Sequence, residues 1–303
     1  MVEPHPPAAS FDAVYFDGAI RRADEARFAA DDHGVLFGFG FFESFRTSGG
    51  RPHLLARHWS RLDAACARAG LALPGHFLAR DRGQLANVLR ELLARHARPE
   101  AVFRYTVTAG APSPDQTYAR PVELLTLRPL PPAPRPEGVA LRVLALARDS
   151  GEWSPRPKSL NQANALLGAQ ELRRRGARPD DEGLFLDRDG FVVETPRQAL
   201  AWVRDGKLCF PDASVGALAS TGLAWACEQV PASAAVRATV DDLLRAEAVI
   251  AVNAVRGVTP VRELWNAGDD VRLGTFASSA HPLLAGLMRC WSDALQATSR
   301  GEG

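Results

Sequence analysis

Two hydrophobic patterns alternate along the 303 residues of this chain and predict a mixture of helices and strands. Apolar residues recur every three or four positions over 58–69, 84–96 and 284–295, which is typical of amphipathic helices. Alternating or continuous apolar runs predict strands at 102–108, 122–127, 138–147, 184–186, 191–193, 201–203 and 208–210. Residues 13–20 are expected to form a strand pair bent at Asp17-Gly18, and 248–261 a buried strand that runs into a Gly/Pro loop. Gly190 and Gly206 lie in turns between short strands, so two β-hairpins are expected in the second half. The pattern indicates an α/β (α+β) protein.

A proline-rich segment marks the clearest boundary in the chain. Five of the eight residues in 129–136 are proline, a density that excludes helix and sheet and gives a stiff, extended connector. We therefore predict a small N-terminal domain at 13–128, a linker at 129–137 and a larger domain at 138–303. The Pro/Ala-rich residues 1–12 lack the apolar core of a signal peptide and are expected to form a disordered tail.

Composition narrows the possible functions. Hydrophobic residues make up 46% and charged residues 23%, as in soluble globular proteins, and the formal net charge of +1 gives no general attraction for nucleic acid. No run approaches the roughly 20 apolar residues of a membrane span. The four cysteines are far apart and form no CxxC pair, so we expect neither a zinc site nor disulfides. A metal-free protein of the reducing cytoplasm fits these features.

Lysine is almost absent from this chain, and one lysine stands in an unusual place. Lysine and arginine total 36 residues, but only Lys158 and Lys207 are lysines. Lys207 follows a turn, whereas Lys158 follows Pro155 and Pro157 and precedes a helical pattern. An arginine cannot replace a lysine that must lose its proton to form an imine. Lys158 is therefore a candidate catalytic residue; the alternative is a surface lysine at a helix start.

Two further residues extend this chemistry. Arg61 lies on the predicted helix 58–69, and Glu194 directly follows the second strand of the first hairpin. An amine, an anion-binding arginine and a carboxylate are the groups that pyridoxal phosphate (PLP) requires for its aldehyde, its phosphate and its pyridine nitrogen. The three residues therefore suggest a PLP site.

Six motifs, in the same order, resemble those of fold-type IV (class IV) PLP enzymes, the family of branched-chain and D-amino-acid aminotransferases and aminodeoxychorismate lyases. They are Asp32-His33-Gly34 with Phe37-Gly38-Phe39-Gly40-x-Phe42-Glu43-Ser44-x-Arg46, His58-x-x-Arg61-Leu62, Lys158-Ser159-Leu160-Asn161, Phe191-Val192-Val193-Glu194, Gly216-Ala217-Leu218 with Ser220-Thr221-Gly222, and Asn253-Ala254-Val255-Arg256-Gly257-Val258-Thr259-Pro260-Val261. The resemblance runs from about Val14 to the C-terminal helix.

The resemblance implies a fold and a set of roles. It implies a small N-terminal α/β domain, a larger C-terminal β-barrel-like domain with helices, and a homodimer that acts on a small amino substrate at a site between the domains. Lys158 would be catalytic and bind PLP, and Glu194 would contact the pyridine nitrogen. Arg61 with Ser220, Thr221 and Gly222 would hold the phosphate, Ala254 and Val255 would form a second cofactor loop, and Phe37 and Ser44 would contact the substrate.

The motifs also depart from the family in places that bear on the reaction. Phe39 replaces an acidic residue, 195–199 differ from the usual sequence after the glutamate, and Thr108-Ala109-Gly110 lacks an arginine that many lyases place after a similar strand. Ser44 and the loop that starts at Asn253 look more lyase-like than branched-chain-like. The resemblance thus favours an aminodeoxychorismate lyase of folate biosynthesis, which converts 4-amino-4-deoxychorismate to 4-aminobenzoate and pyruvate. The alternatives are an amino-acid aminotransferase and a catalytically silent PLP-binding homologue.

Overall fold

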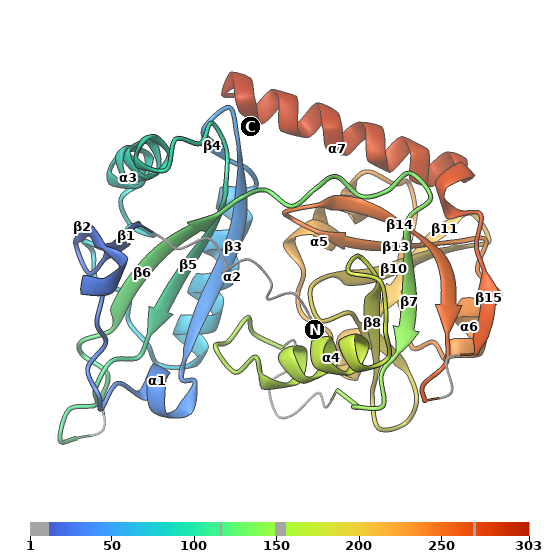
Figure 1. Cartoon of the computed structure of the whole chain (residues 1–303), viewed down its shortest axis with the longest axis horizontal. Helices are drawn as coiled ribbons and strands as arrows, with labels where there is room; N and C mark the ends of the chain where they lie inside the picture. The colour runs from blue at the N-terminus through green and yellow to red at the C-terminus, as the bar shows by residue number, and fades with distance from the viewer. Residues whose placement is uncertain (1–11, 116, 149–155, 269–270, 303) are drawn as a thin grey trace, which may run out of the picture. The chain divides into compact units, whose positions relative to one another are not determined.

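The computed structural model describes residues 12–115, 117–148, 156–268 and 271–302, and the chain forms two compact units (Figure 1). The first unit comprises Met1–Pro131, Lys158–Asn161 and Leu295–Gly303, and the second comprises Pro132–Pro157 and Gln162–Ala294. The first boundary falls inside the proline-rich segment. Lys158–Asn161 and the chain end, which the sequence placed in a continuous second domain, make their contacts with the first unit. The predicted tail at 1–12 lies, except for Asp12, outside the described residues.

An antiparallel six-stranded sheet with the order β2-β1-β6-β5-β3-β4 forms the core of the first unit. The strands are β1 (Ala13–Phe16), β2 (Ala19–Arg22), β3 (Gly40–Ser48), β4 (Arg51–Pro52), β5 (Val102–Thr108) and β6 (Val122–Arg128). The helices are α1 (His33–Phe37), α2 (Leu55–Arg68) and α3 (Arg82–Arg95), with a 3-10 turn η1 at Ala23–Glu25. The amphipathic helices predicted at 58–69 and 84–96 therefore form, and each begins two or three residues earlier than its apolar pattern.

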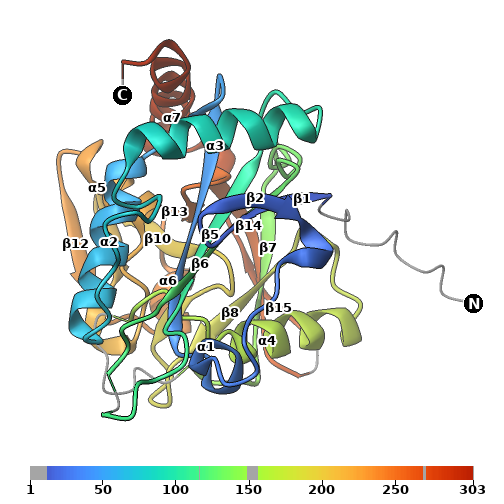
Figure 2. The same cartoon turned by 90° about the vertical axis from the view of Figure 1, so that its left-hand side faces the viewer.

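Both long helices of this unit cover the same face of the sheet (Figure 2). Residues opposite one another in neighbouring strands share a face, as Tyr15, Leu125, Tyr105 and Glu43 do across β1, β6, β5 and β3. The ring of Trp59 on α2 lies 5.1 Å from that of Tyr105, and the Gln84 amide on α3 donates to the Tyr15 hydroxyl at 3.5 Å. The other face of the sheet thus carries the alternate residues, which include Phe42, Ser44 and Arg104.

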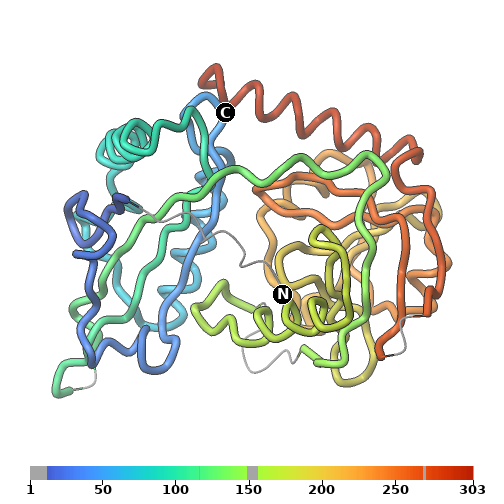
Figure 3. Tube along the Cα trace, in the orientation of Figure 1, coloured from blue at the N-terminus to red at the C-terminus, as the bar shows by residue number. Residues whose placement is uncertain are grey.

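The second unit contains nine strands in the order β12-β11-β10-β13-β14-β7-β8-β9, with β15 paired to β14. The strands are β7 (Val139–Val143), β8 (Glu182–Leu186), β9 (Val192–Glu194), β10 (Ala199–Arg204), β11 (Lys207–Pro211), β12 (Ser233–Val236), β13 (Ala248–Asn253), β14 (Gly257–Trp265) and β15 (Arg272–Thr275). The helices are α4 (Ala163–Arg174), α5 (Thr221–Glu228) and α6 (Val240–Leu244), with 3-10 turns η2 (Ala213–Val215) and η3 (Ser278–Ala280). The last helix of the trace in Figure 3, α7 (Pro282–Arg300), belongs to this unit up to Ala294 and to the first unit from Leu295 on.

A pairing between β9 and β10 closes β10, β13, β14, β7, β8 and β9 into a ring. Its interior is filled by buried apolar side chains that include Leu141, Leu184, Leu200 and Val249. Both predicted hairpins are present as β8–β9 and β10–β11. The segment 248–261, predicted as a buried strand that runs into a Gly/Pro loop, contains β13 and the first part of β14, and the chain turns back between these two strands. The Asn253 side chain accepts hydrogen bonds from two backbone N–H groups in this turn, and Gly257 adopts a φ of +74°.

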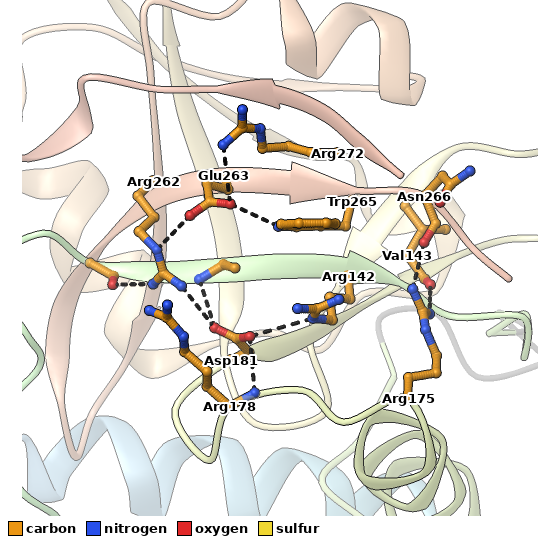
Figure 4. A network of polar contacts seen from close by, with 12 residues as sticks. Arg142, Val143, Arg175, Arg178, Asp181, Arg262, Glu263, Trp265, Asn266 and Arg272 are labelled. Carbon is orange, nitrogen blue, oxygen red and sulfur yellow. Dashed lines mark hydrogen bonds and ion pairs between the residues drawn. The ribbon is translucent and has the colours of Figure 1, made fainter. Parts of the chain in front are cut away.

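A buried carboxylate links the two strands of the parallel pair β7–β14 (Figure 4). Asp181 is 2% exposed and accepts from the guanidinium groups of Arg142 at 3.4 Å and Arg262 at 3.2 Å. It also accepts from the backbone N–H groups of Ala140 and Arg178. Since a buried charge is stable only when it is paired and hydrogen-bonded, this network stabilises the ring at a parallel junction.

Within the described ranges, none of the helices combines the length and the apolar character that crossing a lipid bilayer requires. In the same ranges, no three His, Cys, Asp or Glu side chains gather in a cluster suited to a metal ion.

Candidate active site

Lys158 lies on a short extended segment that adds to the edge of β3. The Phe42 N–H donates to the Lys158 carbonyl at 2.9 Å, and the Leu160 N–H donates to the Gly40 carbonyl at 3.0 Å. Ser159 forms an antiparallel bridge with Phe41 between these bonds. Backbone pairing thus fixes the base of the Lys158 side chain, and its Nζ lies 4.5 Å from the centre of the Phe42 ring.

Two glycines explain how this segment approaches so closely. A Cβ atom added to Gly40 would lie 2.8 Å from the Leu160 side chain and would also collide with the Val107 carbonyl. Gly38 ends α1 in the left-handed region with a φ of +68° and lies against the backbone of Asn161. At both positions the absence of a side chain thus allows the backbone of this aromatic run to pack closely.

Arg61 forms a two-point ion pair with Glu43. Its Nε donates to Glu43 Oε1 at 2.8 Å and its Nη2 donates to Oε2 at 2.6 Å, so α2 is joined to β3. His58, one helical turn earlier, donates from Nδ1 to the same Oε2 at 2.6 Å. Glu43 and His58 are each 1% exposed, and such a fork of parallel hydrogen bonds is among the strongest pairings of charged groups.

The electrostatics of this cluster follow from its burial and its partners. Burial alone would raise the pKa of Glu43, but the Arg61 charge and the hydrogen bonds from Arg61 and His58 lower it to about 2. Burial lowers the pKa of His58, and the neighbouring charges of Arg61 and Lys158 lower it further against the opposing effect of Glu43. The cluster is therefore a glutamate anion, an arginine cation and a neutral imidazole.

Arg104 is a cation of this unit that the sequence analysis missed. Its guanidinium carbon lies 3.5 Å from the centre of the Phe42 ring, the ring that Lys158 also contacts. Arg104 lies opposite Ser44 in the β3–β5 register and donates to the Thr106 hydroxyl at 3.4 Å. Burial, together with the charge of Arg128, lowers its pKa to about 10. No carboxylate contacts Arg104 among the described residues, so this guanidinium can receive an anion.

Glu194 is the last residue of β9 and is 4% exposed. Its Oε2 accepts from the Leu218 N–H at 2.9 Å. Its Oε1 accepts from Arg156 and forms an ion pair with Arg148 at 3.4 Å. A carboxylate has about four acceptor positions, and these three contacts leave one for a further donor.

The predicted phosphate turn forms the N-terminus of α5. Ser220 is the N-cap and accepts from the Leu223 N–H at 3.2 Å, and Thr221 and Gly222 are the first two residues of the helix. A Cβ atom added to Gly222 would lie 2.7 Å from the backbone of Asn253, so the helix end packs against the turn that contains Ala254 and Val255. Backbone N–H groups and the helix dipole make such an end suitable for a phosphate.

The structure thus brings the predicted residues together in two groups. In the first unit, Lys158 lies beside β3, which carries Ser44 and the carboxylate partner of Arg61. Phe37 is 68% exposed on α1, with its ring 4.8 Å from that of His33. In the second unit, Glu194 and Arg156 both form hydrogen bonds with the turn 216–218. Gly222, in the segment 220–222, lies against the backbone of 253–254. The roles assigned to these residues stay predictions.

The donors present fit PLP. The cofactor offers an aldehyde that reacts with an amine, a phosphate dianion and a pyridine nitrogen that hydrogen-bonds a carboxylate. The first unit offers an amine, that of Lys158. The second unit by itself offers the N-terminus of α5, whose Gly222 lies against the backbone of Asn253, and the buried carboxylate of Glu194, which has one acceptor position left.

Comparison with known proteins gives the family. The model of the amino-transferase class IV family matches residues 40–264. The aminodeoxychorismate lyase of Bacillus subtilis is 29% identical over 210 residues, which are 68% of this chain and 69% of that protein. The bifunctional aminodeoxychorismate lyase / D-amino acid transaminase of Mycobacterium tuberculosis is 26% identical over 202 residues, 64% of this chain and 66% of that protein.

Among solved structures, the chain resembles a fold IV transaminase from Curtobacterium pusillum with a TM-score of 0.74 and 23% identity, over 96% of this chain and 99% of that one. The family match covers well over half of the chain and includes all the candidate residues except Phe37. The chain therefore belongs to the class IV aminotransferases, a family of PLP-dependent enzymes with the fold-type IV architecture. The fold and the family expected from the six motifs are both confirmed.

Proposed function

We propose that this chain binds PLP through Lys158 and acts as an aminodeoxychorismate lyase. The observation that carries the cofactor assignment is the placement of Lys158. One of only two lysines in the sequence, it lies on a segment whose backbone is hydrogen-bonded to β3 at the Lys158 carbonyl and at the Leu160 N–H. A solvated surface lysine needs no such support. When bound, PLP supplies an electron-withdrawing ring that stabilises a carbanion at the substrate carbon next to the amine.

The chain's own residues supply the other requirements of the reaction. The Lys158 amine is the base that takes a proton from the substrate and returns one, and β3 holds its backbone in place during this transfer. Arg61, with its guanidinium oriented by Glu43, and the N-terminus of α5 bind the phosphate. The Glu194 carboxylate would accept a hydrogen bond from the pyridine nitrogen.

The substrate assignment rests on charge and on relatives. Arg104 stacks on the Phe42 ring and has no carboxylate partner among the described residues, which suits a carboxylate of the substrate. Ser44 lies opposite Arg104 and adds a hydroxyl to the same face of the sheet. The relative from Bacillus subtilis is named an aminodeoxychorismate lyase, which supports the lyase over other class IV activities.

Aminotransfer is the second candidate, because the relative from Mycobacterium tuberculosis is named as both a lyase and a D-amino acid transaminase. The acceptor dependence separates the two reactions. A lyase given 4-amino-4-deoxychorismate releases 4-aminobenzoate and pyruvate without any 2-oxo acid, whereas a transaminase turns over only when such an acceptor is present. Turnover of a D- or L-amino acid with 2-oxoglutarate, and none of 4-amino-4-deoxychorismate, would replace the first candidate by the second. No product in either assay would identify a silent homologue.

The cofactor assignment has its own test. Borohydride reduction of the PLP-loaded protein, followed by peptide mapping, should place the adduct on Lys158. Lys207, which lies exposed at the start of β11, is the internal control and should carry none. The K158A variant should lose the adduct and K207A should keep it. An adduct on Lys207, or none in a cofactor-replete sample, would refute the assignment.

We also expect a homodimer in the cytoplasm, as the resemblance to the family implies. The apolar side chains of Val35, Leu36 and Phe37 are each more than half exposed on α1, which is consistent with a covering partner copy. Light scattering on the protein as it elutes from a size-exclusion column measures its molar mass directly. A monomer at micromolar concentration would contradict this expectation.

A further inference from the structure

Glu194 is shared between two arginines. Its Oε1 accepts from Arg156 Nη2 and lies 3.4 Å from Arg148 Nη1, and its Oε2 accepts from the Leu218 N–H. The carboxylate is buried, and the side chains of Arg148 and Arg156 are 6% and 19% exposed. One negative charge is thus flanked by two positive charges in a site with little water.

Arg156 is fixed by the turn that also fixes the carboxylate. Its Nε donates to the Gly216 carbonyl at 3.3 Å, and its backbone forms a parallel bridge with Leu218. Leu218 in turn donates its N–H to Glu194. The guanidinium, the turn and the carboxylate form a closed ring of contacts, so Arg156 cannot swing away without breaking several of them.

Arg148 is directed at the same oxygen from a second side. Its guanidinium carbon lies 4.1 Å from the centre of the Phe185 ring, and its Nε has no hydrogen-bond partner among the described residues. Burial, opposed by Glu194 and reinforced by the Arg156 charge, lowers the pKa of Arg148 to about 10. It remains a cation at neutral pH, and Glu194 is the carboxylate that it contacts.

The charge balance has a consequence for any group that Glu194 contacts. A single carboxylate beside a pyridine nitrogen favours the protonated nitrogen, whereas nearby cations disfavour it. Here the two guanidinium groups compete for the carboxylate and leave the cluster with a net positive charge. A third cation next to them, such as a pyridinium, is stabilised less than it would be by Glu194 alone.

We propose that Arg156 is a positioning residue which, with Arg148, lowers the proton affinity of the PLP pyridine nitrogen through Glu194. It thereby moderates how strongly the cofactor withdraws electrons. This inference rests on the proposed function, since it concerns PLP bound at Glu194. Arg156 stands two residues before Lys158, so one short segment carries both the amine and the group that adjusts the ring.

The ring nitrogen can be observed directly. The holoenzyme is loaded with PLP labelled with ¹⁵N in the ring, and the ¹⁵N shift of the nitrogen is followed as the pH is raised. In the wild-type protein the nitrogen should release its proton within the pH range in which the enzyme is stable. In R156Q its pKa should rise by about one to two pH units, the usual effect of one nearby charge.

Two variants separate charge from structure. R156K keeps the positive charge and should titrate close to the wild type. R204Q removes an arginine of the same unit whose ion pair is with Asp242 at 3.5 Å, and it should leave the titration unchanged. Should R156Q fail to fold, R148Q removes the other cation from the same oxygen and must move the pKa in the same direction.

The sign of the shift decides the outcome. A ring nitrogen that stays protonated throughout in the wild type, or a pKa in R156Q that is unchanged or lower, overturns the inference. A lower pKa would mean that Arg156 only aims the carboxylate. If no PLP is attached to Lys158 in the wild type, the proposed function itself has failed, and the borohydride mapping shows this independently of the titration.

Discussion

Replacement of Glu43 by glutamine tests how strongly the ion pair with Arg61 and His58 stabilises the first unit. The pKa of Glu43 falls from an ordinary value of 4.5 to about 2 in the folded chain. Each pH unit of this difference corresponds to about 1.4 kcal/mol, so the ionised carboxylate contributes roughly 3 kcal/mol to the free energy of unfolding at neutral pH. E43Q should lose about this amount, because the amide leaves the Arg61 fork without its anion.

The same difference predicts a pH dependence. A carboxylate whose pKa is lowered on folding gives its full stabilisation above the ordinary value, and the stabilisation is lost as the pH falls from about 4.5 towards 2. The gap in stability between wild type and E43Q should therefore be widest near pH 7 and should narrow below pH 4.5. His58, whose pKa is lowered by burial, adds a separate loss of stability that begins at its ordinary value of 6.5 and continues as the pH falls.

Urea unfolding at several pH values, followed by far-UV circular dichroism and tryptophan fluorescence, measures both effects. Glu91 provides a matched control, since it pairs with Arg95 at 2.6 Å but both side chains are about half exposed. E91Q should change the stability by less than about 1 kcal/mol. A loss in E43Q no larger than in E91Q, or a gap that persists unchanged at pH 3, would refute the argument.

Two further predictions concern the phosphate and the ring of strands. R61A should weaken PLP binding by roughly ten- to a hundredfold, since a charge-assisted hydrogen bond is worth ~1.5–3 kcal/mol; unchanged affinity in a fluorescence titration would mean that Arg61 serves only Glu43. D181N should destabilise the second unit by about 3 kcal/mol, because Arg142 and Arg262 lose their buried anion. Calorimetry measures the unfolding temperatures of D181N and of the control R204Q, which removes an exposed ion pair. Equal unfolding temperatures for the two variants would contradict the prediction for D181N.

The residues that the sequence reveals are those whose type is rare or whose motif is local. Lys158 is visible because lysine is scarce in this chain, and Glu194 because it ends a hairpin strand with a clear alternating pattern. Arg104 and Arg156 give no such signal. Arginine supplies nearly all the basic residues of the chain, so a single arginine does not stand out in the sequence. What distinguishes them is the ring or the carboxylate that they contact, and these partners are distant in sequence.

The elements show the same division between local and long-range information. Apolar periodicity locates α2, but the helix begins at Leu55 because Leu54 takes a left-handed turn with a φ of +55°. The position of the turn between β13 and β14 depends on the Asn253 side chain, which accepts hydrogen bonds from the backbone of its own turn. Closure of the second unit by β9 and β10 is set by packing across the whole sheet and has no local pattern.

The position of Glu194 at the closure of the ring has one further consequence. The residue pairs with Phe185 of β8 on one side and with Ala199 of β10 on the other, so it stands on the strand that makes the sheet continuous. A slip of one residue on either side would turn the carboxylate to the opposite face. Correct assembly of the ring and correct orientation of the carboxylate are therefore a single event: a molecule whose strands joined in the wrong register would present valine where the proposed cofactor contact requires an acid.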